Sequence, residues 1–349
     1  MRLRLGRRII GDGAPCFIVA EAGVNHNGDV DRAFKMVRVA KQSGADAIKF
    51  QSFNPEALAT ATAPLAAYQR RSDGRQRSQV EMLRGLALDE DEQREIERAC
   101  RSAGITFLST PFDDASARFL ADLGVPAFKI GSGDLTNLPL LRLVAGFDRP
   151  MFISTGMGTM EEVEEAVRTV KRGGHSKLVV LQCTTAYPER AMDANVRVIP
   201  EYRRKLRTLV GFSDHTIGFT AAVAAVALGA CVVEKHFTLS RRLPGPDHRA
   251  SLEPAELRRF VAHIREAEAV LGDGRKRVLP IERPNIVPAR KSVVATIAIP
   301  AGTRIRSSML AIKRPGSGIP PRDVREVIGK IARVNIPADS LISWRQVQP

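Results

Sequence analysis

Eight short apolar runs recur along the chain before Gly272, and helix-like windows lie between them. The runs span residues 16–21, 47–51, 106–111, 127–133, 151–156, 178–184, 209–215 and 231–237. Runs of this length suit buried strands, and strands that alternate with helices predict a parallel sheet. A doubly wound open sheet shares this alternation, but eight regular units favour closure. We therefore predict an α/β fold, a (β/α)8 TIM barrel.

Three of the intervening windows carry helix-end signals. Window 31–44 ends on a glycine suited to a C-cap, and window 89–104 has acids in its first turn and also ends on glycine. Window 159–174 opens with Thr159 and Glu162 in the spacing of a capping box. The stretch 52–88 is longer than a usual connection between a strand and a helix, so we expect it to form a lid or an extra helix.

The composition changes after Gly272. Residues 273–291 contain three prolines and many charges without a period, which is typical of a linker. From Ser292 the pattern becomes short β-like pieces separated by turns. We predict a barrel over 1–272, a linker over 273–291 and a small β-rich domain over 292–349. A domain this small would gain stability by docking against another surface.

Bulk composition places the chain among ordinary soluble proteins, with 349 residues of which 44% are hydrophobic and 26% charged. It contains no apolar run of about 18 residues, so no membrane-spanning helix is expected. The basic start of the chain has no apolar stretch behind it, which argues against a secretory signal. Four cysteines without a framework spacing indicate reduced thiols and a cytoplasmic protein.

The formal net charge is +15, from 53 Lys and Arg against 38 Asp and Glu. Such a chain can bind nucleic acid, a membrane surface or an anionic substrate. However, the basic residues are scattered, and only 5% of the residues are aromatic, which leaves few rings for stacking on bases. A solvated arginine-rich surface is therefore favoured, and we expect no nucleic-acid or membrane partner.

Polar side chains end all eight predicted strands. In a (β/α)8 barrel these ends meet at one rim, where the active sites of this fold lie. The polar residues at the strand ends are Glu21, Lys49, Gln51, Ser109, Thr110, Lys129, Ser132, Asp134, Ser154, Thr155, Thr184, Thr185, Ser213, His215, Glu234 and His236. One or two such ends would carry little information, but eight on one rim indicate a functional site.

Lys49 and Lys129 lie within strands, where burial without an anion would be costly. The hydroxyl groups around them can donate hydrogen bonds to phosphate oxygens, and the glycine-rich turns "GSGD" and "GMG" let backbone N–H groups approach a ligand. Together these features predict a phosphorylated anionic ligand, whereas either lysine alone could be a surface residue. The "GMG" turn lacks the third glycine of a dinucleotide fingerprint, so NAD binding is not expected.

His215 and His236 end neighbouring strands, so their rings can converge. Two imidazoles, with the remaining positions open to water and substrate oxygens, suit a catalytic divalent ion such as Mn²⁺. A single histidine here would more often cap a helix or fill the core. The chain has no Cys2His2 or H-E-x-x-H spacing, which argues against a structural zinc site.

Long motifs, in order along nearly the whole chain, resemble those of the sialic acid synthase family. They include "EAGVNHNG", "IKFQ", "STPFD", "KIGSGDLTNLPLL", "STGMGTMEEVEEAV", "LQCTTAYP", "GFSDHTIG" and "EKHFTLSRRLPGPDHRASLEP". The C-terminal part, with "KRPGSGI", resembles the antifreeze-like (SAF) domain of that family. The resemblance implies a C–C bond-forming transferase that joins phosphoenolpyruvate to N-acetylmannosamine, giving N-acetylneuraminate and phosphate. The alternative is a synthase of a related nonulosonic acid, such as legionaminic or pseudaminic acid or a 9-phosphate form.

The matching motifs imply roles for individual residues. Mn²⁺ would be bound by His215 and His236. The phosphoenolpyruvate site would comprise Lys49, Thr110, Lys129, Ser132, Ser154, Thr185 and Ser213. The sugar site would comprise Gln51, Phe112, Tyr187, Asp247 and Arg314. Proton transfer would fall to Glu21 or Asp134.

The resemblance also implies a domain-swapped homodimer, in which Arg314 reaches the N-acetyl group of the sugar bound by the other subunit. Two positions depart from the pattern of some members, which have Asn in place of Thr185 and Glu in place of Asp134. The sugar specificity of those members therefore does not transfer to this chain.

Two readings from other classes stay open. The antifreeze-like C-terminal part suggests a carbohydrate- or ice-binding protein on a catalytically silent barrel. Glu21, Lys129 and the two histidines argue against it, since a silent barrel has no need of them. The net charge alone suggests a nucleic-acid-binding protein, which would bind DNA tightly and with strong dependence on salt.

Overall fold

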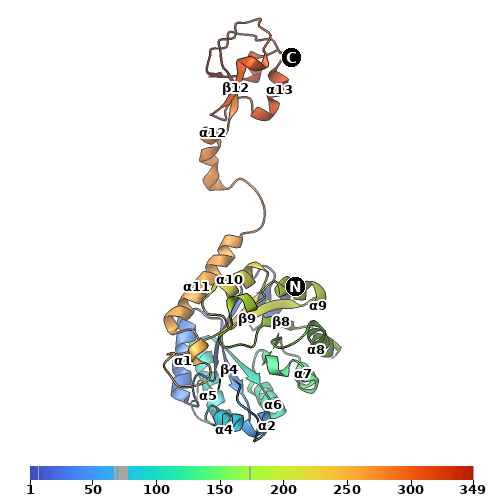
Figure 1. The fold of residues 1–349 in the computed structure, drawn as a ribbon, viewed down its shortest axis with the longest axis vertical. Coiled ribbons are helices and arrows are strands. Elements are labelled where there is room, and N and C mark those ends of the chain that lie inside the picture. The colour runs from blue at the N-terminus through green and yellow to red at the C-terminus, as the bar shows by residue number, and fades with distance from the viewer. Residues whose placement is uncertain (7, 67–68, 70–77, 173, 349) are drawn as a thin grey trace. The chain divides into compact units, whose positions relative to one another are not determined.

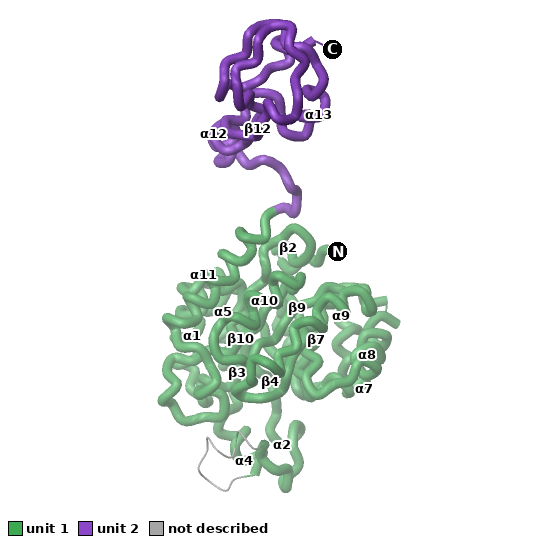
Figure 2. The backbone as a smooth tube through the Cα atoms, turned by 45° about the horizontal axis from the view of Figure 1, so that its top comes forward, with its two compact units in different colours: residues 1–272 green, residues 273–349 purple. Residues whose placement is uncertain are grey.

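The computed structural model describes all residues except 7, 67–68, 70–77, 173 and 349 (Figure 1). The chain divides into two compact units, residues 1–272 and 273–349 (Figure 2). Among the described residues, no helix combines the length and the apolar character needed to cross a membrane. All four cysteines are free thiols.

A sheet of eight parallel strands forms the centre of the first unit (Figure 1). The strands are β3 (Phe17–Gly23), β4 (Ala47–Ser52), β5 (Thr106–Pro111), β6 (Phe128–Ile130), β7 (Met151–Ser154), β8 (Leu178–Cys183), β9 (Leu209–Asp214) and β10 (Val232–His236). Backbone pairing runs in the order β5-β4-β3-β10-β9-β8-β7-β6, and β5 and β6 at its ends lie side by side. Every strand overlaps one of the eight predicted runs, and the predicted barrel is confirmed.

Helices cover the outside of the barrel. They are α1 (Val30–Gln42), α5 (Glu90–Ala103), α6 (Asp114–Leu123), α7 (Leu138–Ala145), α8 (Met160–Arg172), α9 (Val198–Leu206), α10 (Thr220–Ala227) and α11 (Pro254–Leu271). The predicted capping box begins α8: Glu162 N donates to Thr159 Oγ1 at 3.3 Å, and Thr159 N donates to Glu162 Oε2 at 2.8 Å. Helix α5 ends at Gly104, whose φ of 68° favours glycine.

In the described part of the stretch 52–88, two short helices are α2 (Pro55–Leu58) and α4 (Gln79–Arg84). The expectation of an extra helix there is therefore met within the described residues, while 67–68 and 70–77 lie outside them. The N-cap of α4 is Ser78, which forms a capping box with Glu81. Val80, Met82 and Leu83 are buried, so this helix turns an apolar face towards the protein.

The strand side chains alternate between two cores. Outward residues such as Ile18, Ile48 and Phe128 pack beneath the helices. The inward apolar residues lie towards the amino ends of the strands and are Phe17, Val19, Ala47, Leu108, Ala127, Phe152, Val179, Leu181, Leu209 and Val232. The next inward position is polar in six of the strands, is Cys183 in β8, and in β9 is a glycine that is followed by an inward serine. The barrel interior is thus apolar at its amino end and polar at its carboxyl end.

The basic start of the chain belongs to the barrel. Strands β1 (Arg2–Leu5) and β2 (Arg8–Gly11) form an antiparallel hairpin. Its residues Leu3, Leu5 and Ile10 are buried in the same cluster as the inward apolar residues of the barrel, whereas Arg2, Arg4 and Arg8 are exposed. The hairpin therefore closes the amino end of the barrel with apolar side chains.

The second unit contains a small antiparallel sheet, as the β-like pieces after Ser292 predict, and it includes the residues 273–291 of the predicted linker. Strands β11 (Ser292–Ala295), β12 (Leu310–Lys313) and β13 (Ser340–Leu341) form an antiparallel sheet in the order β12-β11-β13. A separate core fills the domain and includes Val293, Ile305 and Ile336. Within the predicted linker, Pro280–Asn285 forms a 3-10 helix and α12 spans Ile286–Ala289.

Truncation of the hairpin should destabilise the barrel. We expect Ile10→Ala to lower the free energy of unfolding by about 2–5 kcal/mol, because the side chain is fully buried in the inner cluster. Ile9→Ala is the matched control, since the neighbouring Ile9 is 51% exposed on the other face of the same strand. Urea unfolding followed by far-UV circular dichroism measures both. Equal stability of the two variants would show that the hairpin does not plug the barrel.

Candidate active site

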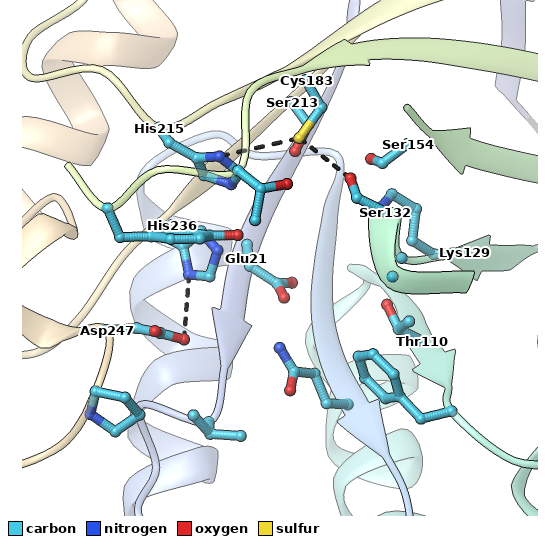
Figure 3. Close-up of a pocket in the computed structure, with 18 of the residues that line it drawn as sticks. Glu21, Thr110, Lys129, Ser132, Ser154, Cys183, Ser213, His215, His236 and Asp247 are labelled. Carbon is cyan, nitrogen blue, oxygen red and sulfur yellow. Dashed lines mark hydrogen bonds and ion pairs between the residues drawn. The ribbon is translucent and has the colours of Figure 1, made fainter. Parts of the chain in front are cut away.

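A pocket of about 450 Å³ lies at the carboxyl end of the barrel strands (Figure 3). This volume is within the usual range for small-molecule sites. The predicted residues that line it are Glu21, Lys49, Gln51, Thr110, Phe112, Lys129, Ser132, Asp134, Ser154, Thr185, Tyr187, Ser213, His215, His236 and Asp247. Arg314 belongs to the second unit, where it is exposed after β12. All but one of the predicted site residues therefore lie around one cavity.

Four buried charges form the floor of the pocket. Lys49 Nζ lies 2.8 Å from Glu21 Oε1 and donates to Thr110 Oγ1 at 2.9 Å. Glu234 Oε1 lies 3.9 Å from Lys49 Nζ and 3.6 Å from Lys129 Nζ. We call Glu21, Lys49, Lys129 and Glu234 the charge quartet. Its two cations are matched by two carboxylates. The burial of the lysines therefore does not by itself require an anionic ligand, contrary to the inference from their position in the sequence.

Burial and pairing shift the pKa values within the charge quartet. Burial raises the pKa of Glu21 to about 7, although the charge of Lys49 opposes this. Burial also works against ionisation of Glu234, but Lys129 and Lys49 hold the pKa of that carboxyl below its usual value. Glu234 is thus the permanent anion, and Glu21 can gain or lose a proton near neutral pH, as a general acid or base must.

Several hydroxyl groups converge beside the charge quartet. Within the described part of the chain, Ser154 Oγ and Thr185 Oγ1 are buried without a hydrogen-bond partner. Ser132 Oγ accepts a hydrogen bond from Gly156 N at 3.0 Å. A Cβ atom on Gly156 would lie 2.2 Å from Thr185 Oγ1 and 2.8 Å from Ser132 Oγ, so only glycine allows this approach. Since buried unpaired hydroxyls cost free energy, their convergence indicates a ligand with oxygen acceptors.

The rings of His215 and His236 lie on the other side of the pocket, with centroids 5.4 Å apart (Figure 3). Two imidazoles that bind one ion through nitrogens at about 2.1 Å have centroids roughly 5 Å apart. His215 Nδ1 lies 2.7 Å from the Thr184 carbonyl oxygen, to which its N–H donates, so Nε2 remains for a ligand. His236 Nδ1 lies 3.9 Å from Asp247 Oδ2. The geometry fits an ion held by both rings.

The two imidazoles differ in protonation. Burial opposes a charge on His215, but the neighbouring Cys183 and the Thr184 carbonyl raise its pKa to about 9. Burial and the charge of His215 lower the pKa of His236 well below its usual value. An ion bound by both rings would displace the proton of His215, because a ligating imidazole is neutral. In the part of the chain that the structure describes, no group of three or more His, Cys, Asp or Glu side chains is arranged for a metal, so two imidazoles would be the protein donors.

Tyr187 covers the histidine pair. Its ring centroid lies 4.2 Å from that of His215 and 5.7 Å from that of His236, at interplanar angles of 44° and 87°. Asp247, whose pKa burial raises to about 6, lies next to His236. The aromatic ring and the carboxyl group thus border the space in front of both imidazoles.

Several lining residues had no predicted role, and two of them are Glu234 of the charge quartet and Cys183 beside His215. Glu234 is a predicted strand end without an assigned function, and Cys183 was not considered, although its Sγ lies 3.9 Å from His215 Nδ1 and 3.4 Å from Ser132 Oγ. The alternation of inward positions could have found both, since Cys183 follows Leu181 and Glu234 follows Val232 at a spacing of two. Apolar residues of the stretch 52–88 also line the pocket and were not predicted.

Comparisons with known proteins agree with the fold and the motifs. The model of the NeuB family matches residues 36–276, and that of the SAF domain matches residues 290–348. An N,N'-diacetyllegionaminic acid synthase of Legionella pneumophila is 41% identical over 342 residues, which cover 97% of this chain and 96% of the relative. An N-acetylneuraminate-9-phosphate synthase of Mus musculus is 40% identical over 349 residues, covering 98% of this chain and 95% of the relative.

A solved structure is similar as well. It is the N-acetylneuraminic acid (sialic acid) synthetase of Leptospira borgpetersenii serovar Hardjo-bovis in complex with citrate. The two proteins are 32% identical, and they superpose with a TM-score of 0.73 over 82% of this chain and 95% of the other.

Glu21→Gln should change how stability depends on pH. Because burial raises the pKa of Glu21 from its usual 4.5 to about 7, the folded state keeps a proton that the unfolded state loses. This contribution to stability is present below about pH 4.5 and is lost as the pH rises to about 7. Glutamine mimics the protonated form, so the variant should gain stability relative to the wild type over this range, by up to about 3 kcal/mol.

Urea unfolding at several pH values, without metal or ligand, measures this difference. Glu164→Gln is the control, because Glu164 lies at the surface beside Arg168, and its difference from the wild type should stay flat. A flat difference for Glu21→Gln as well would mean that Glu21 is ionised throughout.

Proposed function

The chain belongs to the NeuB family, and from this premise we propose that it condenses phosphoenolpyruvate with an N-acetylated, mannose-type sugar to give a nine-carbon 2-keto acid and phosphate. The observation that carries the proposal is the meeting of unpartnered hydroxyls, the charge quartet and two imidazoles in one pocket. The names of the relatives point to more than one sugar acceptor. N-acetylneuraminate is therefore one possible product among related nonulosonic acids.

Phosphoenolpyruvate would bind over the charge quartet. Its phosphate would accept hydrogen bonds from the hydroxyls of Thr110, Ser132, Ser154 and Ser213 and from Lys129, and its carboxylate would face Lys49 and Thr185. Lys129 is suited to this role because it lies 3.6 Å from Glu234, a looser pairing than the 2.8 Å between Lys49 and Glu21. Hydroxyls already in place stabilise the phosphate without reorganising as the charge moves.

A divalent ion such as Mn²⁺ would be held by His215 and His236, where it would act as a Lewis acid on the sugar aldehyde. The hydrogen bond from His215 to the Thr184 carbonyl fixes the ring so that Nε2 faces the ligand. Gln51, Phe112, Tyr187 and Asp247 line the adjoining space and would hold the open-chain sugar with its aldehyde near the imidazoles.

The reaction joins C3 of phosphoenolpyruvate to the aldehyde carbon of the sugar. As this bond forms, positive charge develops at C2, water adds there, and phosphate leaves with cleavage of the C–O bond. Glu21 would take the proton from the attacking water, since its pKa of about 7 allows both protonation states at neutral pH, and the former aldehyde oxygen would take up a proton to become the new hydroxyl. Asp134 is the second candidate for this proton transfer. Burial also raises its pKa, and it is not a member of the charge quartet.

We also propose the homodimer that the family resemblance implies, in which Arg314 serves the sugar site of the other subunit. In this chain Arg314 is exposed immediately after β12 and follows an exposed Lys313, so its guanidinium group is accessible to a partner. Size-exclusion chromatography with light scattering tests the oligomeric state.

Loss of either imidazole should weaken ion binding. We expect His215→Ala and His236→Ala each to reduce the affinity for Mn²⁺ by at least about 100-fold, because only two protein donors are available. Electron paramagnetic resonance of free Mn²⁺ measures this without turnover. His263→Ala, which removes a half-exposed ring on α11, should bind like the wild type. Wild-type affinity in both site variants would place the ion elsewhere.

Sugar-dependent phosphate release tests the function itself. The protein, Mn²⁺ and phosphoenolpyruvate should release phosphate only when an N-acetylated mannose-type sugar is added. Ser154→Ala should raise the KM for phosphoenolpyruvate about tenfold, the cost of one hydrogen bond, with little change in stability because this hydroxyl has no partner among the described residues.

Thr208→Val is the matched control for Ser154→Ala. Thr208 Oγ1 is also buried without a partner, but it lies before β9 at the amino end of the barrel, so activity should not change. The absence of phosphate release with every sugar would refute the synthase. Thermal hysteresis without turnover would instead favour the silent-barrel alternative.

A further inference from the structure

The backbone pairing between β9 and β10 ends one residue before the two histidines of the pocket. Its last pair of Cα partners is Lys235 and Asp214, and β9 itself ends at Asp214. His236 remains in register with Glu21 on the other neighbouring strand, β3, whereas His215 lies beyond the end of β9. The ladder between β9 and β10 therefore does not hold His215 against His236.

A buried ion pair continues where this ladder ends. Lys235 Nζ lies 2.9 Å from Asp214 Oδ2, as an ion pair without the alignment of a hydrogen bond. The same Nζ donates a hydrogen bond to the carbonyl oxygen of Thr216. One ammonium group thus contacts the residues on both sides of His215, and its own residue directly precedes His236.

The chain around His215 is held by further hydrogen bonds. Asp214 Oδ1 accepts from Thr216 N at 2.8 Å and from Thr216 Oγ1 at 2.7 Å. The carbonyl oxygen of His215 accepts from Glu189 N at 2.9 Å. The backbone of His215 is therefore held by Glu189 from the connection after β8 and, through its two neighbours, by Lys235 from β10.

The Lys235–Asp214 pair is placed behind the imidazoles and not beside the substrates. Since side chains alternate along a strand, both residues point away from the barrel interior, and neither belongs to the described residues that line the pocket. Both are at most 1% exposed. A buried ion pair is weak evidence for stability, because desolvation offsets its attraction, and fixing register is the best-attested use of buried polar pairs.

We propose that the Lys235–Asp214 pair is a positioning pair, which holds His215 at the distance from His236 at which one divalent ion can bind both rings. This inference rests on the proposed function and adds two residues to its ion site. Residues that orient metal-binding imidazoles typically contribute about 10–100-fold to the affinity for the metal.

A variant that removes both charges tests the proposal without leaving either member of the pair unmatched. When Asp214→Asn is combined with Lys235→Met, the amide oxygen can still accept from Thr216, but the link from β10 to the chain around His215 is lost. We expect this double variant to bind Mn²⁺ at least about tenfold more weakly than the wild type, as measured by electron paramagnetic resonance of free Mn²⁺. At saturating Mn²⁺ the KM for phosphoenolpyruvate should be unchanged, because the charge quartet and both imidazoles remain.

Two further variants separate positioning from stability. Asp46→Asn is the matched control, since it breaks an ion pair with Arg265, 2.8 Å long, at the amino end of the barrel. It should unfold at a lower urea concentration than the wild type but bind Mn²⁺ equally well. Asp214→Asn alone changes no volume and serves if the double variant does not fold. It should weaken Mn²⁺ binding by a smaller factor, because the hydrogen bond from Lys235 to Thr216 remains.

The outcomes distinguish this inference from the proposed function. Wild-type affinity for Mn²⁺ in the folded double variant, or in Asp214→Asn if the double variant does not fold, would overturn the positioning role. An equal loss of affinity in Asp46→Asn would also overturn it, because the effect would then follow stability in general. If the wild type does not bind Mn²⁺, the ion site and this inference fail together, while sugar-dependent phosphate release decides the synthase separately.

Discussion

The pairing of four buried charges is the constraint around which the site is built. Lys49 lies between Glu21 and Glu234, and Glu234 also faces Lys129. Removal of Lys49, Lys129 or Glu234 would leave an unmatched buried charge at a cost of about 3–5 kcal/mol. Glu21 differs, because burial raises its pKa to about 7, so that its charge can be lost near neutral pH. Because the lysines are matched by carboxylates, the hydroxyls of Ser154 and Thr185, which have no partner among the described residues, remain available to a ligand.

The residues that stabilise the barrel interior and the residues that line the pocket lie at opposite ends of the barrel axis. At the amino end, Phe17, Val19 and the hairpin residue Ile10 form an apolar plug. At the carboxyl end the inward positions hold groups that burial disfavours, such as the unpartnered hydroxyl of Ser154. Such groups are tolerated because the apolar half and the outer helical layer stabilise the fold independently of them.

The barrel could be predicted because each strand is a short apolar run with a helical window after it, and the site because polar residues end those runs. The hairpin escaped prediction, since Leu3, Leu5 and Ile10 alternate with arginines in a segment that resembles a solvated tail. The pairing of lysines with Glu21 and Glu234 depends on which side chains face inward together, which only strand register determines. The apolar lining residues Leu58, Met82, Leu83 and Leu86 belong to the long connection between β4 and α5, for whose path the sequence has no periodic signal.

Because side chains alternate between the two faces of a strand, the barrel strands can accept only certain insertions and deletions during evolution. Lys49 points into the barrel while Ile48 and Phe50 on either side of it point out to the helices. Insertion of a single amino acid within β4 would exchange these faces, burying a cation among the helices and withdrawing it from the ligand. Loops can therefore change length by any number of residues during evolution, whereas the strands must keep theirs or change in steps of two.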